Sequence, residues 1–240
     1  MTIFFNIKQL FLFCLLLACC QFWFNGAFLT ACGVMCGIMV LCFYKDKKNL
    51  VLNVIFFSAF LLNLWYVSAS FGNVRQYDYF NFVMHADYFV QNNFFLFRPS
   101  GYLQSVYFQP PLWGGLAGIF MKVLTFDYVR FISLFAVSGA MIYFWRLTGE
   151  LGFKDYIRFL TFGWFCFFPF QGILANLVNN DALVYFLMTA MLYYAYRWLV
   201  LSQMREALIL GGLLFAAGMI KFSGLMMVPA LGMLGLYKLM

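Results

Sequence analysis

The chain has 240 residues, of which 65% are hydrophobic and only 10% charged, and its formal net charge is +7. No water-soluble core absorbs that share of apolar side chains, so the composition excludes an ordinary soluble domain and requires several bilayer-crossing runs of about 20 residues each. Lys and Arg stand in short clusters between these runs, as in cytoplasmic loops, so we interpret the positive charge as a topology signal and not as a nucleic-acid surface.

The first part of the chain predicts three membrane-spanning helices. The Asn25-Gly26 pair predicts a tight turn between the first two, and the basic run Lys45-Asp46-Lys47-Lys48 places the next connection in the cytoplasm. The third helix therefore leaves the membrane on the outer face. We divide the chain into a two-helix N-terminal extension and a larger membrane module. The helices are predicted at residues 3–24, 27–44 and 50–71, the extension at 1–49 and the module at 50–240.

Residues 72–127 form the long outer loop that follows the third helix. Residues 77–88 predict a helix with Asp78, Asn81 and His85 on one face, lying at the membrane surface with that face toward water. The apolar run 112–126 is near the lower limit for a span, and the positive-inside rule favours a surface position for it, because the later basic residues then fall inside. Gln109-Pro110-Pro111 predicts the start of this helix.

The rest of the chain predicts five more spans, near residues 128–147, 157–174, 182–201, 207–220 and 222–240. The expected fold class is all-α: a polytopic helical membrane protein with about eight transmembrane helices and a long outer first loop carrying juxtamembrane helices. The polar turn at residues 176–181 returns to the outer face, so its acidic residue and those of the long loop are expected to converge. Because the chain stops directly after an apolar run, we expect the module to be incomplete at its C-terminus.

Four residues are candidates for chemistry on these grounds. A carboxylate at the membrane surface can take a proton from a hydroxyl or amine, which makes Asp78 the first candidate base and Asp87 the second. His85, the single histidine, either positions a phosphate or satisfies a buried partner. Lys221 interrupts an apolar stretch, where an ammonium is costly and so marks a functional site, unless it only breaks two helices and reaches the interface.

Several short motifs follow one another along the chain: Asp78, Gln109-Pro110-Pro111-Leu112, Tyr128-Val129-Arg130, Asn179-Asn180-Asp181-Ala182-Leu183 and Lys221-Phe222-Ser223-Gly224 with Pro229. Taken in order, they resemble those of the GT-C superfamily of membrane glycosyltransferases, which includes protein O-mannosyltransferases and the lipid A aminoarabinose transferase. The resemblance covers residues 50–229 and is closest to the bacterial, glycosyltransferase family 39-like branch. In many of those proteins the acidic residue stands four positions before a His that opens an aromatic helix, whereas Asn81 stands here, so the base stays open between Asp78 and Asp87.

The resemblance implies an inverting transfer of a sugar from a polyprenyl-phosphate donor to a glycan, lipid or protein acceptor. The reaction would take place on the periplasmic or luminal face, most simply of a bacterial inner membrane. The acidic residue would deprotonate the acceptor, and basic groups would stabilise the phosphate leaving group. The expected donor-binding residues are Lys221, His85, Arg75 and Arg98, and the expected structural or positioning residues are Asn81, Gln109, Pro110, Pro111, Arg130 and Asp181.

No cofactor is required by this reading, and the cysteines and the histidine show no spacing that predicts a zinc site. A divalent ion near Asp78 or Asp181 stays open. Two other functions also stay open: a transporter or lipid flippase, and a noncatalytic membrane subunit with the same fold. Transporters show paired broken helices in matching halves, whereas the polarity here gathers in one outer loop, which favours surface chemistry.

Overall fold

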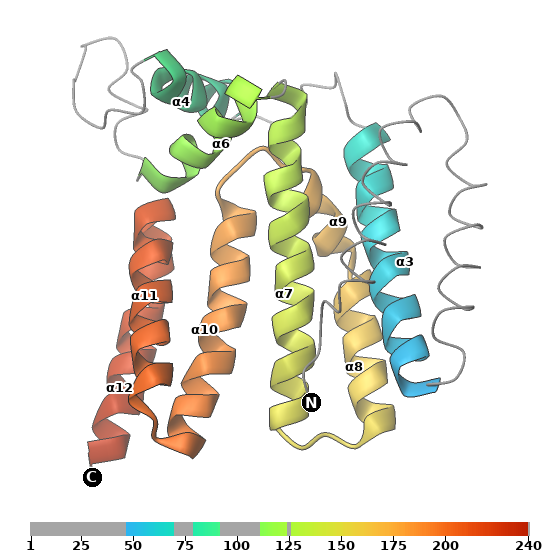
Figure 1. Ribbon diagram of the computed structural model, residues 1–240, viewed down its shortest axis with the longest axis vertical. Coiled ribbons are helices and arrows are strands. Elements are labelled where there is room, and N and C mark those ends of the chain that lie inside the picture. Colours follow the sequence, from blue (N-terminus) through green and yellow to red (C-terminus); the bar gives the residue numbers. More distant parts are fainter. Residues whose placement is uncertain (1–46, 70–78, 92–110, 124–125, 240) are drawn as a thin grey trace. The chain divides into compact units, whose positions relative to one another are not determined.

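The computed structural model describes residues 47–69, 79–91, 111–123 and 126–239 (Figure 1). Within these ranges every regular element is a helix, as the all-α prediction requires. The predicted spans at 3–24 and 27–44 lie outside the described residues, so the count of eight stays a prediction. The chain divides into two compact units, residues 1–61 and 62–240, and helix α3 (Lys47–Ala69) runs across the boundary between them.

Two short helices occupy the predicted outer loop, α4 (Tyr79–Gln91) and α6 (Pro111–Val123). Pro111 is the first residue of α6, where its missing N–H costs nothing, in agreement with the predicted helix start. The two helices pack closely, with the ring centroids of Phe82 and Trp113 4.9 Å apart. Gly114 permits this approach, because a Cβ atom there would lie 2.8 Å from ring atoms of His85 and Phe89.

Among the described helices, two are long and apolar enough to cross a membrane: α7 (Arg130–Glu150), which follows the short 3-10 helix η2 (Phe126–Val129), and α10 (Asp181–Leu201). A third span results if α8 (Asp155–Phe167) and α9 (Pro169–Asn176) are counted together, although they bend by 45°. The bend has a local cause, since Pro169 disfavours helical geometry at Phe168, whose backbone is extended.

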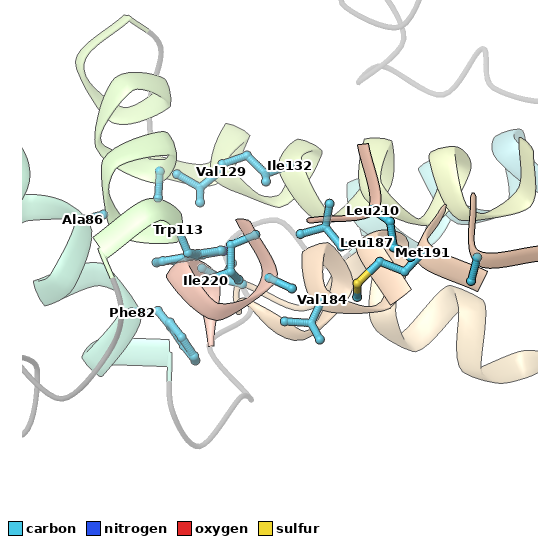
Figure 2. Close-up of a cluster of buried hydrophobic side chains, with 14 residues drawn as sticks. Phe82, Ala86, Trp113, Val129, Ile132, Val184, Leu187, Met191, Leu210 and Ile220 are labelled. Carbon is cyan, nitrogen blue, oxygen red and sulfur yellow. The ribbon is translucent and has the colours of Figure 1, made fainter. Parts of the chain in front are cut away.

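The chain then continues through α11 (Met204–Ile220), the 3-10 helix η3 (Phe222–Met226) and α12 (Met227–Leu239). Within residues 62–240, Figure 1 shows α7, α10 and α11 side by side, with α4 and α6 across the end where α7 begins and α11 ends. A single buried cluster joins these five helices (Figure 2), and Trp113, 1% exposed, lies in it next to Ile220. The short helices of the outer loop are therefore packed onto the ends of the long ones.

A charged network holds the opposite end of the same helices. Arg197 of α10 donates to Glu150 at the end of α7, at 3.1 Å, and to Glu206 at the start of α11, at 3.0 Å. Glu206 is only 2% exposed. Lys154, Arg158 and Arg205 belong to the same connections, so the structure gathers at this end the basic residues that the positive-inside rule would place together.

Candidate functional site

The candidate site is an ion pair between Asp181, the first residue of α10, and Lys221, the residue after α11. The Lys221 Nζ atom lies 2.5 Å from Asp181 Oδ1, and the two side chains are 40% and 45% exposed respectively. The two predictions for Lys221 therefore do not exclude each other. Lys221 separates two helices, and its charge is both paired and accessible. An ammonium in this position is tolerated because it is paired and reaches solvent.

Asparagines of the turn before α10 hold this pair. The Asn179 Nδ2 atom donates to Asp181 Oδ2 at 3.0 Å, while the Asp181 backbone N–H donates to Asn179 Oδ1 at 3.1 Å. Asn180 is 2% exposed, and its Nδ2 atom donates to the carbonyl of Ile220 at 3.2 Å. The carboxylate and the helix break that carries Lys221 are thus each held by a different asparagine.

The start of α7 supports the same turn. Arg130 is 5% exposed, which is unusual for an arginine, and its Nη1 atom donates to Asn176 Oδ1 at 3.0 Å. Ser133 Oγ donates to the Leu177 carbonyl at 2.6 Å. The sequence singled out Arg130 and Asp181 but missed Ser133, Asn176 and the separate role of Asn180. The sequence feature that could have indicated these contacts is the group of Asn residues in a short interhelical turn, because Asn side chains readily hydrogen-bond to backbone groups.

The backbone at Lys221 is a sharp break. Lys221 is extended, with φ −160° and ψ 138°, and its carbonyl accepts a hydrogen bond from the Gly224 N–H at 2.8 Å. Gly224 lies against α11 so closely that a Cβ atom there would stand 2.6 Å from the Ala217 carbonyl oxygen. Only glycine fits this close approach, so the turn that follows α11 and places Lys221 requires Gly224.

His85 of α4 lies inside the contact between α4 and α6 and not on a water-facing side, which differs from the predicted polar face. It is 4% exposed, its ring stacks on Trp113 with centroids 6.3 Å apart, and Phe89 packs edge-on at 5.4 Å. Desolvation by burial lowers the pKa of His85 to about 4, so the ring is neutral at pH 7. A neutral, enclosed imidazole fits a packing role, and phosphate contact by His85 stays a prediction.

This burial predicts a pH-dependent stability for the α4 and α6 pair. An exposed histidine in the unfolded chain titrates near 6.5, so acid protonates the unfolded state first. The contribution of neutral His85 is therefore complete above pH 6.5 and is lost as the pH falls toward about 4. We expect the melting temperature of the detergent-solubilised protein to fall over this interval, and the fall to be smaller in His85→Phe, which cannot titrate. Equal slopes in the two proteins would contradict the assignment.

The other predicted residues are placed as follows. Asp87 of α4 is half-buried and accepts a hydrogen bond from Gln91 Nε2 at 2.5 Å. Asn81 belongs to α4 and Pro111 opens α6, but their side chains lie outside the described residues. Their roles stay predictions, and so do those of the candidates that lie entirely outside the described residues: Arg75, Asp78, Arg98, Gln109 and Pro110.

The arrangement offers hydrogen-bond donors to a polar ligand. Lys221 carries three N–H donors and uses one of them for Asp181, and a ligand that approached it would also meet the Asp181 carboxylate. Within the described ranges no group of three His, Cys, Asp or Glu residues gathers in a way that would hold a metal ion. Comparison with known proteins adds nothing to this geometry: no family model, curated protein or solved structure matches the chain.

Proposed function

We propose that the protein is an integral membrane glycosyltransferase that transfers a sugar, with inversion, from a polyprenyl-phosphate donor to an acceptor on the outer face of the membrane. One observation supports this most. Motifs far apart in the sequence, namely Arg130, the turn before Asp181, and Lys221, meet at the end of the long helices against which α6 packs. A transfer reaction at the membrane surface needs a phosphate-binding group held in place there, and Lys221 with these supports would provide it.

In the proposed reaction, an acceptor hydroxyl or amine attacks the anomeric carbon from the side opposite the phosphate. The new bond forms as the carbon–oxygen bond to phosphate breaks, and the acceptor proton passes to a carboxylate, for which Asp78 is the first candidate. The polyprenyl phosphate leaves as an anion. Lys221 would bind that phosphate, assisted by Arg75 and Arg98, and would stabilise the charge that grows on it.

The distribution of charge supports a location in a membrane with this site outward. Apolar helices α7 and α10, and the bent pair α8 and α9, have the length and composition to cross a bilayer. The basic residues Lys154, Arg158 and Arg205 stand at the end opposite Lys221, which under the positive-inside rule is the cytoplasmic end. We therefore propose a multi-pass protein of a bacterial inner membrane with its active face toward the periplasm.

A transporter or lipid flippase is the second candidate, and two helix breaks favour it. One break lies at Phe168, between α8 and α9, and the other at Lys221, between α11 and η3. Broken helices with charged residues are typical of substrate sites in transporters. The glycosyltransferase is preferred because the paired charges lie at the end of the helices and not between their midpoints.

The test is transfer of radiolabelled sugar from polyprenyl-phosphate donors to acceptors in membranes that contain the full chain. We expect transfer by the wild type, and in Lys221→Ala a donor KM raised about tenfold or more, since a charged hydrogen bond is worth about 1.5–3 kcal/mol. Lys154→Ala removes an exposed lysine at the other end and is the matched control. An inserted wild-type protein without transfer would refute the proposal, and movement of a labelled lipid across proteoliposomes would then establish the second candidate.

A further inference from the structure

We infer that Asn180 is a positioning residue, which holds Lys221 beside Asp181 by fixing the place where α11 ends. The consequence for donor binding rests on the proposed function, but the positioning itself does not. The hydrogen bond from Asn180 to the Ile220 carbonyl joins the residue before Asp181 to the residue before Lys221. Each of the two contacts spans 40 residues of sequence, and the ion pair lies one residue further along both segments than the hydrogen bond.

Loss of this hydrogen bond is expected to be costly, because the groups that it joins are buried. The last carbonyls of a helix have no partner within it, and Ile220 is the last residue of α11. Ile220 and Asn180 are each 2% exposed, so water does not readily replace a lost partner. Figure 2 shows Ile220 among apolar side chains next to Trp113. A carbonyl left unsatisfied in such surroundings is costly, and the backbone after Ile220 would move to relieve it.

The two members of the ion pair depend on different supports. Asp181 is held by its side-chain and backbone bonds with Asn179, which do not involve α11. Lys221 is held through its backbone, whose N–H donates to the Ala217 carbonyl at 3.0 Å and whose carbonyl accepts from the Gly224 N–H at 2.8 Å. Both bonds lie within α11 and η3, so the bond from Asn180 to Ile220 is what ties this break to the start of α10. Loss of the Asn180 amide is therefore expected to leave the carboxylate in place and to release the lysine. This asymmetry separates a positioning role from a general contribution to folding.

The experiment measures how fast Lys221 is acylated by acetic acid N-hydroxysuccinimide ester in the full chain in detergent, with peptide mass spectrometry as the readout. In the wild type, the ion pair holds the Lys221 Nζ atom against the Asp181 carboxylate, which limits the approach of the reagent to it. Asp181→Asn is expected to raise the rate, and Asn180→Ala to raise it about fivefold, the factor that one net hydrogen bond represents. Thr189→Val is the matched control, because this buried hydroxyl of α10 bonds only to the Tyr185 carbonyl of its own helix.

Cys166 reports on folding in the same samples, since its thiol is free and buried and stays unreactive to maleimide while the helices remain packed. An unchanged Lys221 rate in Asn180→Ala with Cys166 protected would overturn the inference, and so would an equal rise in Thr189→Val. If Cys166 becomes reactive, Asn180→Leu is used instead, because it keeps the branching and the number of side-chain heavy atoms but cannot donate a hydrogen bond. Exposure of Cys166 in that variant as well would make Asn180 a folding residue and reject the positioning role.

In the transfer assay the same variant is expected to lower kcat/KM for the donor about fivefold, because the lysine remains but is less often in place for the phosphate. An unchanged kcat/KM together with a raised acylation rate would show that the position of Lys221 does not matter to the donor. If the protein transfers no sugar at all, the acylation rates still decide the positioning role, so failure of the proposed function and failure of this inference are told apart.

Discussion

Replacement of Asp78 by Asn is expected to reduce sugar transfer by about 10²–10⁴-fold, the range that a positioned general base contributes. Asparagine keeps the size and shape of the side chain but cannot accept the acceptor proton. In the sequence Asp78 directly precedes Tyr79, the first residue of α4, and α4 packs against α6. The measurement is kcat for transfer at saturating donor and acceptor, with the amount of inserted protein determined in parallel.

Asp87→Asn is the matched comparison, because it makes the same change at the second candidate base, which lies in α4. The Asp87 carboxylate already accepts a hydrogen bond from Gln91 within its own helix, which leaves it less available as a base. We expect this variant to keep most of its activity. The reverse pattern, with activity lost in Asp87→Asn and kept in Asp78→Asn, would assign the base to Asp87. Full activity in both would reject an acidic base on this segment.

Arg197→Gln is expected to lower the free energy of unfolding by about 3 kcal/mol, because it leaves a buried carboxylate without its counter-ion. The Arg197 Nη2 atom lies 3.0 Å from Glu206 Oε1, and the Glu206 side chain is 3% exposed, whereas that of Arg197 is 28% exposed. A second bond to Glu150 extends the network to α7. The three helices that carry the candidate site are thus joined at their far ends, and denaturant titration in detergent micelles measures the loss.

Three further variants show whether the lost stability comes from the unpaired charge. Glu206→Gln removes the charge together with the pair and is expected to cost less, about 1 kcal/mol for a hydrogen bond. The double variant Arg197→Gln with Glu206→Gln should recover part of the single loss. Arg205→Gln changes an exposed arginine at the start of α11 and should cost almost nothing. A loss in Arg197→Gln no greater than in Arg205→Gln would show that the network does not stabilise the fold.

The elements that could be predicted are those with strong local signals. The spans predicted near 128–147 and 182–201 correspond to α7 (Arg130–Glu150) and α10 (Asp181–Leu201), whose ends lie within about three residues of the predicted ones. The span predicted at 157–174 was expected as one helix but is bent at Phe168. Hydropathy averaged over the segment did not reveal the bend, whereas Pro169, read by itself, supplies its steric cause.

Amino-acid sequence alone determined the helical class, the apolar runs and the helix start at Pro111, because hydropathy, periodicity and proline sterics act over a few neighbouring residues. Only the tertiary structure decided the partners. Lys221 pairs with a carboxylate 40 residues away, and Arg130 with Asn176, which is 46 residues away, because helix packing brings them together. His85, which periodicity placed on a polar face, is buried because Gly114 allows α6 to approach it. Which side of a helix is covered depends on its neighbours, and a local pattern does not contain them.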